Sequence, residues 1–80
     1  MKLSTEQATR MYFGAGEAIR MVDRERDTVN THGVSLGVDK QYYLETLAEL
    51  RGNLVRNGNE ALATLIRTPG YNTENMKELK

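Results

Sequence analysis

Residues 31–39 read Thr31-His32-Gly33-Val34-Ser35-Leu36-Gly37-Val38-Asp39. Two glycines set among β-branched residues are typical of a loop that lets the chain reverse its direction. Asp39 stands where it can cap a helix that begins directly after it. This stretch therefore predicts the turn of an antiparallel hairpin made of two long helices.

The residues before the loop have the pattern of one long amphipathic helix. Apolar residues recur there at spacings of three and four, namely Ala8, Met11, Tyr12, Ala15, Ala18, Ile19 and Val22. Ser4 followed by Gln7 predicts a capping box, with Leu3 placed to pack against Ala8. Residues 23–27 alternate in charge, which predicts a solvated last turn. We expect a helix from Thr5 to Asp27, or at the latest to Asn30.

The residues after the loop predict a second helix from Lys40 to Ile66. Its apolar stripe consists of Tyr43, Leu44, Leu47, Leu50, Leu54, Val55, Ala61, Leu62, Leu65 and Ile66. Asn57-Gly58-Asn59 interrupts the stripe and predicts a kink or weakened turn, because glycine costs about 1 kcal/mol relative to alanine in a helix. Pro69-Gly70 ends the helix. Residues 71–80 are polar, and we expect a mobile tail unless a neighbour holds it.

These elements predict one all-α domain over residues 1–80. A turn near Val34 would bring Gly16 opposite Gly52 or Leu54, and Tyr12 opposite Gly58. Small residues at such positions let helices approach closely, or alternatively leave room for a planar ligand. A chain of 80 residues buries only about 60% of its unfolded surface when it folds alone. We therefore expect the hairpin to assemble into a symmetric homo-oligomer.

Composition excludes several classes of function. Eleven basic residues balance eleven acidic ones, so the broad positive field of a DNA- or RNA-binding protein is missing. The chain has no cysteine, and neither a signal sequence nor a membrane span is apparent. We expect a cytoplasmic protein with no membrane partner.

No catalytic motif is apparent in the chain. Gly14-Ala15-Gly16 follows no strand and precedes no Gly-Lys-Ser/Thr, so it is not a phosphate loop. His32 has no partner at metal-ligand spacing. Glu45 and Glu49 are expected to be solvated on one helix face. We expect no metal, no cofactor and no enzymatic activity.

Tyrosines and arginines remain as candidate ligand-binding residues. At the open end of the hairpin the candidates are Arg10, Tyr12, Arg67, Thr68 and Tyr71. Arginine can grip phosphate with two hydrogen bonds, and an aromatic face can stack on a base. The alternative interpretation puts Tyr12 in the core and leaves the arginines solvated.

At the loop end, Arg24, Arg26 and Lys40 form a second, weaker cluster. Arg26 can complete a site only if a neighbouring protomer brings its turn alongside.

A run of residues in the second helix resembles a family of small phage proteins. The run is Leu50-Arg51-Gly52-Asn53-Leu54, then Gly58, Ala61-Leu62, Arg67, Pro69, Gly70 and Tyr71. It is similar to the second helix of the anti-CBASS cyclic-oligonucleotide sponges, helical hairpins that sequester the second messengers of a bacterial immune system. The resemblance covers about a third of the chain.

The resemblance implies a compact homo-hexamer in the host cytoplasm. It implies that cyclic dinucleotides bind between protomers, that cyclic trinucleotides are candidates for separate sites, and that neither is cleaved. Family members use an aromatic residue and a basic residue of the first helix, for which Tyr12 and Arg26 are the nearest matches. Arg67 and Thr68 would come from the second helix. The chain departs from the family in having arginine rather than lysine at the basic position.

A different class of function is also open at this point. The chain would then be a helical module that inhibits or adapts a host protein by laying an apolar stripe in a groove. Leu44, Leu47, Val55 and Leu62 would face that partner, whereas in a sponge they would be buried between protomers.

Overall fold

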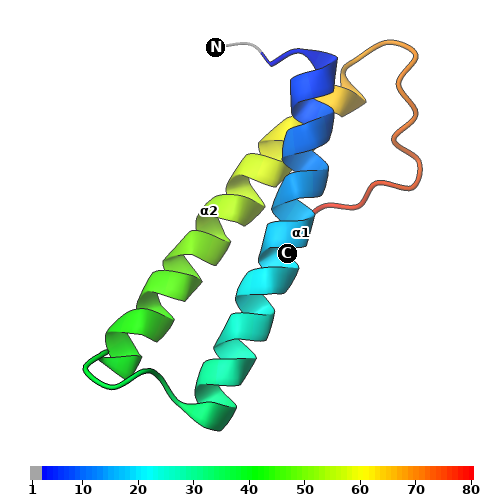
Figure 1. Cartoon of the computed structure of the whole chain (residues 1–80). Coiled ribbons are helices and arrows are strands. Elements are labelled where there is room, and N and C mark those ends of the chain that lie inside the picture. Colours follow the sequence, from blue (N-terminus) through cyan, green and yellow to red (C-terminus); the bar gives the residue numbers. More distant parts are fainter. Residues whose placement is uncertain (1–2) are drawn as a thin grey trace.

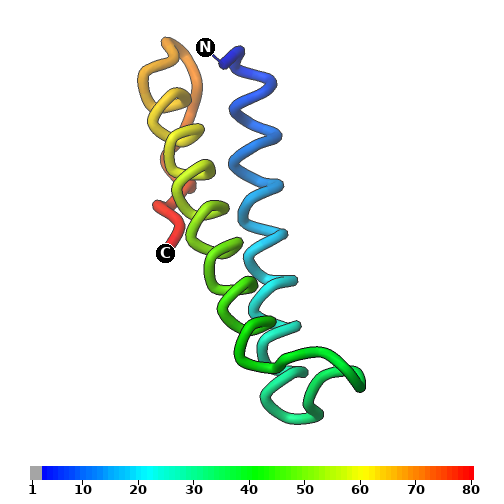
Figure 2. Tube along the Cα trace, turned by 90° about the vertical axis from the view of Figure 1, so that its left-hand side faces the viewer, coloured from blue at the N-terminus to red at the C-terminus, as the bar shows by residue number. Residues whose placement is uncertain are grey.

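In the computed structural model, which describes residues 3–80, two α-helices lie side by side and run in opposite directions (Figure 1). Helix α1 spans Thr5–His32 and helix α2 spans Lys40–Ile66. Figure 2 shows the same hairpin from the side, with residues 33–39 forming the loop that joins the helices. The predicted all-helical hairpin is confirmed.

Both predicted helix starts are confirmed by their capping bonds. The Gln7 N–H donates to Ser4 Oγ at 3.1 Å, and the Ser4 N–H donates to Gln7 Oε1 at 3.0 Å, which completes the capping box. Asp39 Oδ1 accepts from the Tyr42 N–H at 3.0 Å. Each cap satisfies backbone N–H groups that have no partner within the helix.

The predicted end of α1 is wrong, because the helix continues to His32. The alternating charges of residues 23–27 are followed by Val29, which is buried. Burial of this side chain favours one more turn of helix beyond the charged stretch. Gly33 then ends the helix at a φ of 82°, and its N–H donates to the Val29 carbonyl at 2.8 Å.

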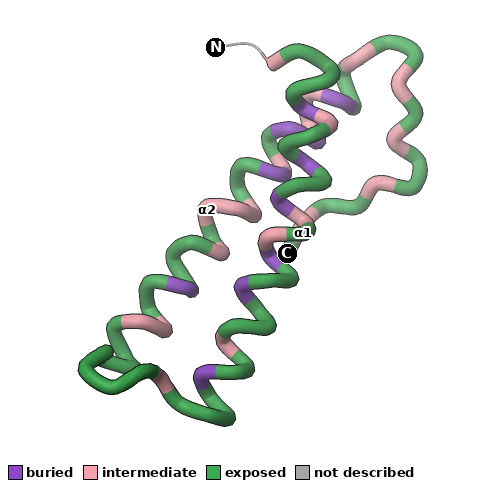
Figure 3. The backbone as a smooth tube through the Cα atoms, in the orientation of Figure 1, coloured by how far each residue is buried: buried purple, intermediate pink, exposed green. Residues whose placement is uncertain are grey.

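The core of the hairpin lies along the facing sides of the two helices, shown as the buried positions in Figure 3. Its buried side chains are Ala8, Tyr12, Ala15, Ile19, Val22, Val29, Leu47, Ala61, Leu62 and Leu65. Leu47 and Leu62 are thus covered within one chain, which corrects the expectation that they face a partner or a neighbouring protomer. The interpretation of Tyr12 as a core residue matches its burial.

The two helices pair about one turn away from the predicted register. A Cβ atom on Gly58 would lie 2.9 Å from Ala15 Cβ, so Gly58 faces Ala15 rather than Tyr12. The chain reverses at Leu36 and Gly37, where the Val38 N–H donates to the Ser35 carbonyl at 3.1 Å, and not at Val34. The extra length of α1 accounts for this shift.

Helix α2 continues through residues 57–59 without a break. The predicted weakened turn is therefore not seen as an interruption of the helix. Gly58 is buried there, and its missing side chain leaves the space that Ala15 and Leu79 occupy. Close packing at this position offsets the low helix propensity of glycine.

The tail leaves the open end of the hairpin, arcs away from the helices and returns to lie beside them (Figure 1). Tyr71, Met76 and Leu79 pack against the core cluster, as Leu3 does from the start of the chain. The polar sequence of residues 71–80 predicts a mobile tail unless a neighbour holds it. In the structure the hairpin itself supplies the holding contacts.

Several large apolar side chains remain exposed on the hairpin. They are Met11, Phe13, Met21, Leu36, Val38, Tyr42, Leu50 and Ile66, with exposed fractions from 37% to 103%. Isolated exposed apolar residues are normal in a monomer. Here they are spread over both helices and the loop, and their apolar area is available for a partner to cover.

Candidate functional site

An open groove lies at the end of the hairpin where α1 begins and α2 ends. Its volume is about 1210 Å³, and its lining residues are Leu3, Ser4, Thr5, Gln7, Glu60, Ala63, Thr64, Arg67, Thr68 and Pro69. Two of the six predicted site residues, Arg67 and Thr68, belong to this groove. The other lining residues were not predicted as site residues, because helix caps and the polar faces of helices do not indicate a groove until the register is known.

The groove brings together groups that suit a small anion. Arg67 is exposed, and among residues 3–80 its guanidinium forms no ion pair. The first turn of α1 adds the positive end of a helix dipole beside the Ser4 and Thr5 hydroxyls. Glu60 contributes one negative charge to the same lining. A phosphate that approached Arg67 could accept two parallel hydrogen bonds from its guanidinium.

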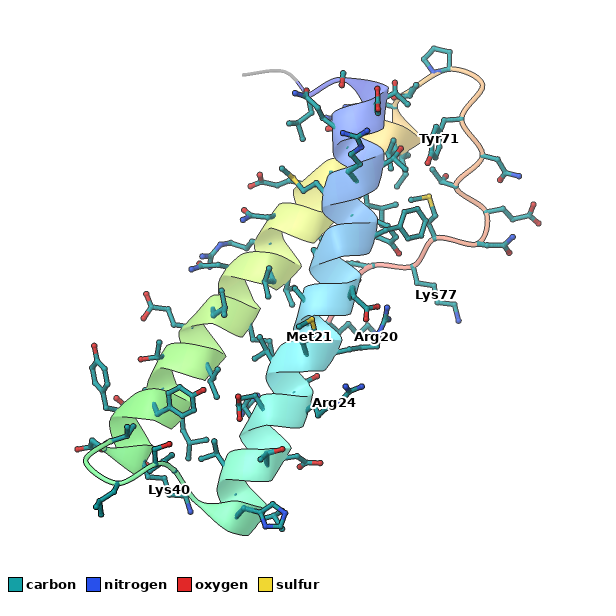
Figure 4. The ribbon with its side chains drawn as sticks, viewed as in Figure 1. Arg20, Met21, Arg24, Lys40, Tyr71 and Lys77 are labelled. Carbon is teal, nitrogen blue, oxygen red and sulfur yellow. The ribbon has the colours of Figure 1, made fainter. Side chains whose placement is uncertain are left out.

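Thr68 and Tyr71 are already engaged within the chain. Thr68 Oγ1 donates to the Thr64 carbonyl at 2.8 Å. The Tyr71 hydroxyl lies 3.0 Å from Thr9 Oγ1, and Figure 4 shows Tyr71 at the point where the tail leaves the helices. Tyr71 thus links the start of the tail to α1 and does not line the groove.

Tyr12 faces the tail rather than the groove. Its side chain is only 8% exposed, and its hydroxyl donates to the Lys77 carbonyl at 2.5 Å. Phe13 packs against it edge-on, with the ring centroids 5.1 Å apart. In this arrangement neither the hydroxyl nor most of the ring is open to a ligand.

The remaining predicted arginines lie apart from the groove. Arg10 Nη2 donates to Glu6 Oε1 at 2.7 Å on the exposed face of α1. Arg26 lies 3.9 Å from Asp23 in the last third of α1. At 1.5 Å per residue along a continuous helix, Arg26 and Tyr12 are about 21 Å apart. One chain therefore cannot place these two residues around one small ligand.

The expected cluster at the loop end is also dispersed. Figure 4 shows Lys40 beside the loop, whereas Arg24 lies further along α1 toward the middle of the hairpin. Arg24 instead lines a small depression of about 180 Å³ with Met21, Glu25 and Thr28.

Charged contacts lower the pKa of two carboxyl groups. The hydrogen bond and the positive charge of Arg20 lower the pKa of Glu17, and the hydrogen bond from Arg51 lowers that of Asp23. Both shifts favour the ionised form, which is the opposite of what a general acid needs. The pKa of Tyr43 is raised by burial and then by the negative charge of Glu25.

Within residues 3–80, no three histidine, aspartate or glutamate side chains come together as a metal site would require. In the same part of the chain, neither helix combines the length and the apolar character needed to cross a membrane. Comparisons with family models, with curated proteins and with solved structures gave no match to this chain.

Proposed function

We propose that this chain is a non-enzymatic sponge that sequesters cyclic dinucleotides, and cyclic trinucleotides at separate sites, and so counters the bacterial immune system that they activate. The resemblance of residues 50–71 to the phage sponges supports this proposal. The protein would act in the host cytoplasm as a symmetric homo-oligomer, a hexamer if it follows that family.

The groove lined by Arg67 and Thr68 is the observation that carries the proposal. If Tyr12 and Arg26 contact one cyclic dinucleotide, they must come from different protomers, because about 21 Å of continuous helix separates them in one chain. The exposed apolar side chains on both helices give the protomers surface with which to associate. A composite pocket between protomers is consistent with both features.

Each residue would have a distinct role in such a pocket. Arg67 would bind a phosphate through its planar guanidinium, and Thr68 would lie beside it in the groove. Tyr12 would stack on a base once residues 77–80 leave its hydroxyl. Arg26 of a neighbouring protomer would supply the second positive charge after its weak contact with Asp23 opens.

Isothermal titration calorimetry with a panel of cyclic di- and trinucleotides tests this proposal. We expect at least one member to bind and to be recovered unchanged. Arg67→Ala should weaken binding about tenfold to a hundredfold, because a hydrogen bond to a charged group contributes about 1.5 to 3 kcal/mol. Arg56→Ala is the matched control, since Arg56 is an exposed arginine of α2 that lies outside the groove.

Absence of binding across the whole panel would contradict the sponge. The alternative is a helical module that binds a host protein. The four side chains expected to face that partner, or a neighbouring protomer in the sponge, are wholly or partly covered within one chain, so they favour neither function. Leu47 and Leu62 are buried within the hairpin, and Leu44 and Val55 are partly covered.

A further inference from the structure

Asn59 binds the main chain of the tail through both polar atoms of its side-chain amide. Its Oδ1 accepts from the Leu79 N–H at 2.7 Å, and its Nδ2 donates to the Leu79 carbonyl at 2.9 Å. These two bonds satisfy both backbone groups of one extended residue, whatever its side chain. Asn59 is partly buried on α2, so water competes less for these bonds than at the surface.

Gly58, the residue before Asn59, makes room for the Leu79 side chain. A Cβ atom on Gly58 would overlap Leu79 Cδ1, and a Cβ atom on Gly16 would lie 3.8 Å from Leu79 Cδ2. Gly52, six residues earlier on α2, has nothing within 4 Å of its Cβ position. The hairpin thus has a specific socket for a leucine between α1 and α2.

Two further side chains bind carbonyl groups of the tail. The Tyr12 hydroxyl donates to the Lys77 carbonyl at 2.5 Å, and Arg51 Nη2 donates to the Lys80 carbonyl at 2.8 Å. We call the surface formed by Tyr12, Gly16, Arg51, Gly58 and Asn59 the tail groove. It binds backbone groups of the tail and the side chain of one leucine. Peptide-docking sites combine the same two kinds of contact.

Residues 72–75 link α2 to this docked end and form hydrogen bonds only with residues close to them in the sequence. These bonds run from the Glu74 N–H to Asn72 Oδ1 at 2.9 Å and from the Met76 N–H to the Thr73 carbonyl at 3.0 Å. Figure 1 shows this part of the tail arching away from both helices. The link therefore does not fix which hairpin receives residues 76–80.

We propose that the tail groove also takes residues 76–80 of a second copy of this chain, so that two copies exchange tails. Every contact of the docked end would form again between chains, because a second copy carries the same segment and the same groove. The exposed apolar residues Phe13, Met21 and Leu50 give two hairpins additional surface to cover. The exchange concerns self-association and does not rest on the proposed function. A tail in the groove covers Tyr12 whichever copy supplies it, so the exchanged form and a base stacked on Tyr12 exclude each other.

Cysteine cross-linking between differently substituted copies tests the exchange, since the chain has no cysteine of its own. One population carries Gly16→Cys and the other carries Leu79→Cys, at positions that the structure brings into contact. The populations are mixed, equilibrated at high concentration and oxidised. We expect a dimer joined between positions 16 and 79, identified by the mass of the linked peptides. The double variant Gly16→Cys/Leu79→Cys shows whether the bond forms within one chain. If it does, and the mixture contains no dimer joined between positions 16 and 79, the proposal is overturned.

Sedimentation equilibrium provides a second test. A variant that ends at Asn75 lacks the exchanged segment and should stay monomeric at concentrations at which the full chain dimerises. Asn59→Ala removes the same two bonds from the closed chain and from the exchanged pair, so it should shift the balance between them far less. A full chain that is monomeric at all concentrations, or a shortened chain that associates as well as the original, would overturn the exchange.

Discussion

Arg51 of α2 joins Asp23 of α1 through a forked contact between the two helices. Arg51 Nε donates to Asp23 Oδ1 at 2.8 Å, and its Nη2 lies 3.4 Å from Oδ2. The same guanidinium also binds the Lys80 carbonyl at 2.8 Å. Arg51 therefore connects both helices and the end of the tail.

This contact predicts a pH dependence of stability. Because Arg51 lowers the pKa of Asp23 below its ordinary value of 3.8, the folded state favours the ionised carboxylate. The resulting stabilisation is fully present above pH 3.8 and is lost as the pH falls from there through the lowered pKa of the folded state.

Urea unfolding of the wild-type chain and Asp23→Asn across pH 2 to 7 measures this effect. We expect Asp23→Asn to flatten the loss of stability at low pH, with a residual slope because the pKa of Glu17 is also lowered. Asp27→Asn serves as the control, since Asp27 forms no ion pair within residues 3–80. Identical acid profiles for Asp23→Asn and the wild type would contradict the assignment.

A pair of glycine substitutions separates helix propensity from packing. Gly52→Ala should stabilise the fold by about 0.5 to 1 kcal/mol, because the position is helical and open. Gly58→Ala should destabilise it despite the same gain in propensity, because the new methyl group overlaps Leu79 and crowds Ala15. Thermal unfolding followed by circular dichroism compares the two variants. Equal stabilisation by both would show that the tail does not occupy the socket at Gly58.

Leu65 and Ile66 test the assignment of the core. Leu65 is fully buried, whereas its neighbour Ile66 is 62% exposed. Leu65→Ala should cost about 2 to 5 kcal/mol through lost burial and the cavity left behind. Ile66→Ala should change the free energy of unfolding by less than about 1 kcal/mol. Chemical denaturation measures both, and similar losses in the two variants would place Ile66 in an interface.

The helices and their caps could be predicted because they depend on local sequence. Ser4, Gln7 and Asp39 act within one turn of their own helix, and the bounds of α2 follow from its stripe and Pro69. The end of α1 depended on Val29, a single apolar residue beyond a charged stretch. Val29 stabilises the last turn of α1 because it is buried in the fold. The local sequence does not show that burial.

The tail contacts and the candidate site depend on the register between the two helices. A shift of one turn changes which residues of α1 and α2 face each other along the whole hairpin. Asn57-Gly58-Asn59 reads locally as a weak point in a helix. In the fold Gly58 leaves space for the side chain of Leu79, and Asn59 binds the backbone of Leu79, 20 residues further along the chain. Tyr12 and Arg67 were expected together at one end of the hairpin, but only Arg67 lines the groove, and the tail covers Tyr12.

Chemical modification of tyrosines tests whether the tail covers Tyr12 in solution. Tyr42 is 71% exposed and should react readily with tetranitromethane, whereas Tyr12 is 8% exposed and should be protected. Leu79→Asp places a charge in the socket, so the tail should detach and Tyr12 should react faster. Peptide mass mapping identifies each modified residue. Fast nitration of Tyr12 in the wild-type chain would show that residues 77–80 do not cover it.

Native mass spectrometry of the purified protein, alone and with a panel of cyclic di- and trinucleotides, measures both assembly and binding. We expect a discrete homo-oligomer that takes up a fixed number of cyclic nucleotides and releases them intact after heat denaturation. A monomer that binds no member of the panel would contradict the proposed sponge.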